Sequence, residues 1–102
     1  MTTEELKERI RNFGIRILKM SDHLPDHYSA IVIAKQITRS ASSAGANYRA
    51  ACRSKSPRDF INKLKIVEEE LDETDYWLAM IEEMNFIPGE RLKELKDRKS
   101  VV

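Results

Sequence analysis

Carboxylates, histidines and cysteine carry most enzyme and metal chemistry, so their spacing is the first feature of the sequence to consider. Glu70 and Glu73 have the spacing of a carboxylate pair, but a carboxylate-bridged di-iron bundle needs inward-facing Glu-x-x-His pairs. Both histidines, His23 and His27, lie far from these glutamates. They could share a metal ion, although two histidines in a turn are more often surface residues. Cys52 lies late in a predicted helix, where a buried or half-buried thiol is a simpler interpretation than a reactive one.

A phosphate-binding loop is also missing. The segment 43–47 reads Ser-Ala-Gly-Ala-Asn and lacks the Gly-Lys-Ser or Gly-Lys-Thr ending that cradles phosphates. We therefore predict a protein that is not an enzyme, with no catalytic residue, metal site, cofactor or small-molecule substrate.

A polar stripe is the next candidate for a functional site. A hairpin that closes near residues 54–57 places Arg39 level with Asp72 and Glu73. The predicted network is partly buried and consists of Gln36, Arg39, Ser40, Ser43, Asn47, Glu70 and Glu73. An ordinary helix-pairing network that fixes the register is the first interpretation. A ligand or nucleic-acid site is one alternative, and solvated side chains are the other.

The charges divide into a basic and an acidic segment. Between residues 27 and 65 the bases are Lys35, Arg39, Arg49, Arg53, Lys55, Arg58, Lys63 and Lys65, with a single acid. Between residues 66 and 86 the acids are Glu68, Glu69, Glu70, Asp72, Glu73, Asp75, Glu82 and Glu83, with no base. The net charge of +1 indicates no partner. The split predicts that the acidic face meets a basic one, within the chain or on a neighbouring copy.

The basic residues nearest the turn at 54–57 form a candidate nucleic-acid site. They are Arg49, Arg53, Lys55 and Arg58. An up-down-up-down bundle brings further bases to the same end: Lys7, Arg9, Arg11, Lys96, Arg98 and Lys99. Such a basic pole could bind phosphates. A solvated helix end is the alternative, because no row of exposed aromatic residues is available for base stacking.

The elements that position these residues are predicted to be helices of a single domain, residues 1–102. Of the 102 residues, 41% are hydrophobic and 34% are charged, a composition typical of amphipathic helices. One cysteine cannot form an internal disulfide, and no apolar run has the length of a membrane span, so we expect a cytoplasmic protein.

Apolar residues recur at alternating steps of three and four throughout, which predicts an all-α, up-down-up-down, left-handed four-helix bundle. The first helix begins at a capping box of Thr2 and Glu5, and the second is capped by Asp26 or Ser29. The third runs from about Arg58 to Phe86 behind an N-cap at Ser56 with Pro57 as its first residue. The short fourth helix runs from about Pro88 to Lys99, so either the tail is truncated or another subunit covers the remaining groove.

Three segments resemble the four helix bundle protein family, which also occurs as reading frames in intervening sequences of bacterial 23S rRNA genes. They are Gln36–Arg49, Ser56–Val67 and Glu70–Leu78, and the resemblance covers about Ile10 to Ile87. It implies a homopentamer without established enzymatic activity. A more distant similarity is to the nucleic-acid-binding accessory protein of diversity-generating retroelements, which is more basic than this chain.

Two functions follow as hypotheses. The protein is a homo-oligomer that binds RNA or DNA through the basic pole, or it is a ring-shaped scaffold that binds another protein and no nucleic acid. Added salt should weaken binding steeply in the first case only, because phosphate contacts release counterions.

Overall fold

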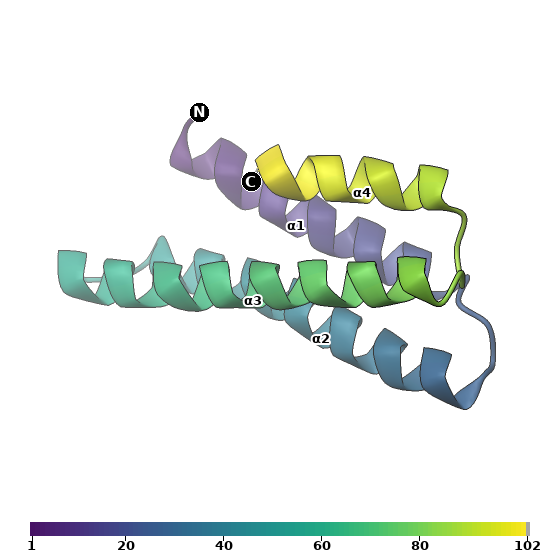
Figure 1. Ribbon diagram of the computed structural model, residues 1–102. Helices are drawn as coiled ribbons and strands as arrows, with labels where there is room; N and C mark the ends of the chain where they lie inside the picture. The colour runs from purple at the N-terminus through teal and green to yellow at the C-terminus, as the bar shows by residue number, and fades with distance from the viewer. Residues whose placement is uncertain (102) are drawn as a thin grey trace.

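The computed structural model describes the backbone of residues 1–101 and the side chains of residues 1–95. Four helices follow one another in the order α1 (Thr3–Ser21), α2 (Tyr28–Ala51), α3 (Pro57–Glu83) and α4 (Gly89–Val101). The hairpin loop between α2 and α3 lies at the same end as the start of α1, and the other two connections lie at the opposite end (Figure 1). The predicted all-α four-helix bundle with a short fourth helix is confirmed. No helix within residues 1–101 is long and apolar enough to cross a membrane.

Two predicted helix starts are confirmed. The Thr2 hydroxyl accepts a hydrogen bond of 3.1 Å from the backbone N–H of Glu5 at the start of α1. The Ser56 hydroxyl accepts one of 3.1 Å from the backbone N–H of Asp59, and Pro57 is the first residue of α3. These side chains satisfy donors that the first turn of a helix leaves unpaired.

The predicted cap of α2 is wrong. The N-cap residue is His27, which has an extended backbone and makes no capping hydrogen bond with its side chain. Asp26 lies one residue too early, and Ser29 already lies within the first turn. The His27 ring packs edge-on against Phe86 instead, with ring centroids 6.1 Å apart. The α1–α2 and α3–α4 connections therefore pack against each other at this end, and α2 begins without a side-chain cap.

The helix α3 ends three residues before the predicted Phe86. Its cap is Met84, and Asn85 follows with a φ of 56°, the left-handed conformation that asparagine tolerates better than most residues. The backbone N–H of Phe86 then donates to the carbonyl of Ile81 at 3.2 Å, and that of Asn85 to Glu82 at 3.0 Å. This pair of bonds is a Schellman motif, which satisfies the last carbonyls of the helix and turns the chain toward α4.

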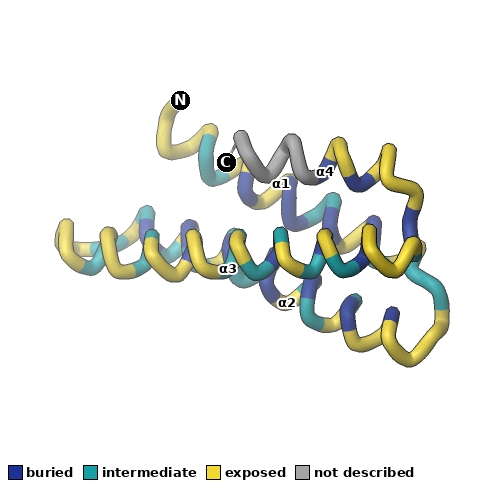
Figure 2. The backbone as a smooth tube through the Cα atoms, in the orientation of Figure 1, coloured by how far each residue is buried: buried dark blue, intermediate teal, exposed yellow. Residues whose placement is uncertain are grey.

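The core follows the predicted seams, and it thins toward the hairpin loop. Fully buried side chains include Ile10, Ile17, Ile37, Leu78, Ile81 and Leu92. Figure 2 shows buried positions recurring along α1 and α2. With 13 residues, α4 is only about 20 Å long and ends well short of the hairpin loop (Figure 1). Near that loop Leu6 and Leu64 are half-buried, and Ile61 is 52% exposed.

Candidate nucleic-acid interface

Helices α1 and α2 approach each other closely where small residues meet. A Cβ atom added to Gly14 would lie 3.4 Å from the carbonyl oxygen of Ala41. One added to Gly45 would lie 3.8 Å from Cγ2 of Ile10 and 3.9 Å from Cα of Arg11. Because these residues extend little beyond the backbone, they bring the helices together without filling the space along the outer edge of the contact.

A groove of about 690 Å³ occupies that outer edge. Its central lining comes from Gly14, Ala41, Ser42, Gly45 and Ala46, and Ile15 and Leu18 add apolar side chains from α1. The charged lining residues are Lys7, Glu8, Arg11, Arg49 and Arg53. Three bases from α1 and α2 and a fourth, Arg53, from the loop just after α2 therefore face one groove with a single acid among its lining residues.

The structure divides the predicted basic pole. Arg49 and Arg53 line the groove together with Lys7 and Arg11 from the start of α1. Lys55 lies exposed in the α2–α3 loop, and Arg58 lies exposed in the first turn of α3, so neither lines the groove. Arg9 is exposed and also lies outside it. The side chains of Lys96, Arg98 and Lys99 lie outside the described residues.

The bases of the groove differ in how far they are neutralised. Lys7 pairs with Glu4 at 3.2 Å, and Arg11 lies 4.0 Å from Glu8. Arg49 and Arg53 form no ion pair with any described side chain. The α2 side of the groove therefore carries the charges that are available to an anionic partner.

Sequence reasoning found the bases but missed the groove. The signal for it is the set of small residues Gly14, Ala41 and Gly45, which allow a close crossing of two helices. The close crossing can be predicted from this set only when the register between α1 and α2 is known, because Gly14 and Ala41 lie far apart in sequence.

The predicted polar network lies on the opposite side of α2, against α3. Arg39 donates to Glu70 at 2.9 Å through one terminal nitrogen and to Glu73 through the other. The Trp77 indole N–H also donates to Glu73, at 3.2 Å. The Arg39 side chain is 50% exposed, whereas those of Glu70 and Glu73 are 14% and 35% exposed. The carboxylates are therefore shielded from water more than the guanidinium.

The ion pair between Arg39 and Glu73 shifts the pKa of both groups. The hydrogen bond from Arg39, followed by the one from Trp77, lowers the pKa of the Glu73 carboxyl. The two carboxylates raise the pKa of Arg39 in turn, with the bond to Glu73 as the largest cause. Both groups therefore stay charged at neutral pH, as a helix-pairing clamp requires.

The remaining network residues have local or different partners. Ser40 is fully buried and shares a hydrogen bond of 2.8 Å with Thr74, a residue of α3 that is not part of the predicted network. Asn47 donates to the carbonyl and the hydroxyl of Ser43, one turn earlier on the same helix. Gln36 is half-buried and forms no side-chain hydrogen bond with another described residue. The network is thus two separate contacts between helices plus two hydrogen bonds from Asn47 to Ser43 within α2.

The other sequence candidates lie apart from both contacts. Cys52 is a free, half-buried thiol next to Tyr48. Burial raises the pKa of the Tyr48 hydroxyl, and the neighbouring Cys52 raises it further. His23 lies near the end of α1, and His27 caps α2. Among the described residues, no group of three or more His, Cys, Asp or Glu side chains is arranged to hold a metal ion.

Comparison with known protein families assigns the chain to a family. The chain matches the family described as 23S rRNA-intervening sequence protein over residues 4–101. The chain belongs to this family. The match includes both the groove and the network, so the two surfaces are features of a 23S rRNA-intervening sequence protein.

A solved structure agrees with this assignment. The chain is similar to a protein of unknown function from the S23 ribosomal protein family of Bacteroides thetaiotaomicron, known from a crystal structure. The two share 34% sequence identity and superpose with a TM-score of 0.90 over 98% of this chain and 89% of the other. No curated protein matches the chain.

Proposed function

We propose that this 23S rRNA-intervening sequence protein is a homo-oligomer that binds RNA through the α1–α2 groove. The observation that carries the proposal is the presence of Arg49 and Arg53 along one groove wall, without acidic partners among the described side chains. Lys7 and Arg11 extend the positive charge to the opposite wall. Clustered lysine and arginine side chains bind a phosphate backbone electrostatically and independently of base sequence.

The shape of the groove also suits a nucleic-acid strand. Its centre consists of small residues, so a phosphate could approach the helix backbones closely. The apolar side chains of Ile15 and Leu18 offer a surface for the faces of bases. RNA is the first candidate because the family name refers to 23S rRNA, and DNA of the same sequence is the comparison.

A gel-shift or fluorescence-anisotropy titration at low salt tests the proposal. We expect the variant R49E/R53E to bind a single-stranded RNA at least roughly tenfold more weakly than the unmodified protein. The slope of log affinity against log salt should also fall by about 1.4, since each phosphate contact to a single strand contributes about 0.7. The matched control is K65E/K93E, which makes the same charge change at exposed positions outside the groove.

Three results would contradict RNA binding by the groove. These are no RNA binding by the unmodified protein, equal binding by R49E/R53E, and equal loss of binding in the control variant. Retained circular dichroism in R49E/R53E would exclude unfolding as the cause of a loss. DNA that binds as tightly as RNA would identify backbone charge, rather than the ribose hydroxyl, as the recognised feature.

Self-assembly is the second part of the proposal, and the resemblance to the four helix bundle protein family suggests five copies. Several acids on α3 form no ion pair with any described side chain: Glu68, Glu69, Asp72 and Glu83. Exposed apolar residues lie among them on α3, namely Ile66 and Tyr76 at 42% and 56% exposure. An acidic face with apolar side chains is suited to a head-to-tail contact with a basic surface of the next copy, which closes into a ring.

Light scattering on the same samples tests assembly and separates the two functions. A mass of one or two chains would contradict the ring. Because Glu70 and Glu73 are already bound by Arg39, the informative variant is E69K/D72K, which should lower the mass of the assembly. A ring that binds no RNA but binds another protein without salt sensitivity would favour the scaffold function instead.

A further inference from the structure

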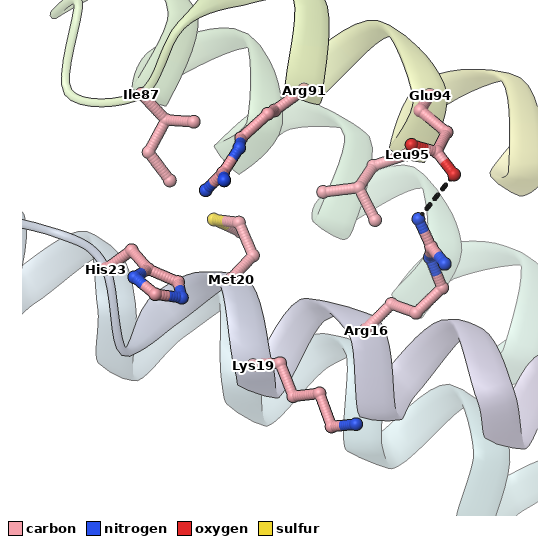
Figure 3. Close-up of a pocket in the computed structure, with 8 residues that line it drawn as sticks. All are labelled: Arg16, Lys19, Met20, His23, Ile87, Arg91, Glu94 and Leu95. Atoms are coloured by element: carbon pink, nitrogen blue, oxygen red, sulfur yellow. Dashed lines mark hydrogen bonds and ion pairs between the residues drawn. The ribbon is translucent and has the colours of Figure 1, made fainter.

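A second cleft, of about 300 Å³, lies between α1 and α4 and shares no lining residue with the α1–α2 groove. Met20 from α1 and Ile87 and Leu95 from the α4 side form its apolar part (Figure 3). All three are buried against the core, with 5–8% exposure. The cleft therefore has a rigid apolar wall rather than a floor of mobile surface side chains.

The rim of this cleft is mostly basic. Arg16, Lys19 and His23 come from α1 and the residues just after it, and Arg91 comes from α4, whereas Glu94 is the one acidic lining residue. Glu94 pairs with Arg16 at 2.7 Å. In Figure 3, Arg91 reaches from α4 toward Met20, and Lys19 points away from the centre at the edge. Two guanidinium groups thus enter the cleft from opposite walls.

The hydrogen-bonding capacity of these two groups is incompletely used. The Nε atom of Arg16 is buried and has no hydrogen-bond partner among the described residues. Arg91 forms no ion pair with any described side chain. Buried donors in folded proteins are nearly always paired, so an unpaired Nε and an unneutralised guanidinium on the walls of one cleft point to an anionic ligand.

We propose that the α1–α4 cleft binds a phosphate monoester carried on a nucleoside. The guanidinium groups of Arg91 and Arg16 donate hydrogen bonds to the phosphate oxygens, a geometry that the planar arginine fork favours. The apolar wall of Met20, Ile87 and Leu95 packs against the nucleoside. A phosphate monoester carries close to two negative charges at neutral pH, which matches this excess of base better than a carboxylate does.

Two sources supply this chemistry, a free mononucleotide and the phosphorylated end of an RNA chain. Isothermal titration calorimetry with AMP tests the site itself, with adenosine and inorganic phosphate as the two half-ligands. We expect AMP to bind at least about tenfold more tightly than either half, because only AMP makes both the phosphate and the apolar contacts. RNA oligonucleotides with a 5′-phosphate or a 5′-hydroxyl, otherwise identical, then test whether the end of a chain is also bound.

The variant R91E should weaken AMP binding at least tenfold, whereas K93E makes the same charge change on an exposed residue of α4 outside the cleft and should not. No AMP binding, equal binding of adenosine, equal binding of inorganic phosphate, or equal loss in K93E would each overturn the site. R49E/R53E should leave AMP affinity unchanged. The experiments therefore test RNA binding by the groove and AMP binding by the cleft separately. AMP binding lost in R49E/R53E would assign the ligand to the groove and overturn the proposal.

Discussion

Helix α2 contacts its two neighbours by opposite means. Toward α1 it presents Ala41 and Gly45, so that the backbones approach closely and no hydrogen bond between side chains joins the two helices within the described residues. Toward α3 it presents Arg39 and Ser40, which bind three polar side chains across the contact. The first contact depends on the absence of side chains, and the second depends on long or polar ones.

This difference explains where the candidate binding surface lies. Long side chains such as Arg39 cover the outer edge of the α2–α3 contact and neutralise its acids. Small side chains leave the edge of the α1–α2 contact open as a groove, and Arg49 and Arg53 beside it form no ion pair with a described side chain. A close crossing of small residues therefore leaves room for a partner. In a crossing fixed by ion pairs, the charged side chains pair with each other and are not available to bind a partner.

The largest expected effect comes from placing a large side chain in the close crossing. The variant G14L should lower the free energy of unfolding by about 2–3 kcal/mol, because its side chain would meet the Ala41 backbone and force α1 away from α2. Chemical denaturation monitored by circular dichroism measures this loss.

The matched control for that variant is G45A. A Cβ atom at Gly45 meets only ordinary contacts at 3.8 Å and 3.9 Å, and alanine favours a helix over glycine by up to about 1 kcal/mol. We therefore expect G45A to be as stable as the unmodified protein or more stable. Unchanged stability in G14L would show that the two helices are not in close contact in solution.

A smaller effect is expected at the α2–α3 contact. Arg39→Ala should lower the free energy of unfolding by about 1 kcal/mol, because the guanidinium is half exposed and water partly replaces its bonds. Arg39→Met removes the charge but keeps most of the packing of the side-chain methylene groups. The difference in stability between Arg39→Met and Arg39→Ala therefore measures the packing, and the loss in Arg39→Met measures the charge. A loss of about 3 kcal/mol or more would indicate that the pair behaves as buried, and no loss would show that the bonds add nothing.

The smallest effect is a dependence on pH at the same contact. Arg39 lowers the pKa of folded Glu73 below its unfolded value of about 4.3, so the stabilisation is complete above that pH and is lost as the pH falls through the folded pKa. The stability difference between the unmodified protein and Glu73→Gln should therefore be constant near neutral pH and shrink as the pH falls below about 4.3. When both proteins also carry Arg39→Met, the difference in free energy of unfolding between Glu73 and its Gln variant should depend less on pH. An equal pH dependence would contradict Arg39 as the main cause of the lowered Glu73 pKa.

Sequence reasoning succeeded at the starts of α1 and α3, where structure depends on local spacing, although it failed at the cap of α2. The caps at Thr2 and Ser56 were predictable because a cap and its partner lie three residues apart. The end of α3 was missed because Asn85 adopts a left-handed conformation inside a run that continues the apolar pattern. The hairpin register correctly placed Arg39 near Glu73, because a short loop fixes which residues of the two helices lie opposite each other. The Ser40–Thr74 hydrogen bond was missed, because a threonine also fits among the apolar residues of a helix face.

The sequence by itself determined the helices, their order and the charge that each one carries, since periodicity, caps and composition act over a few residues. The tertiary structure alone decided which charges remain available. It neutralised Glu70 and Glu73 within the chain, placed Arg49 and Arg53 beside Lys7 and Arg11, and brought Arg91 over the end of α1. These outcomes depend on how helices distant in sequence cross, and the crossing is set by the few small residues that permit close approach.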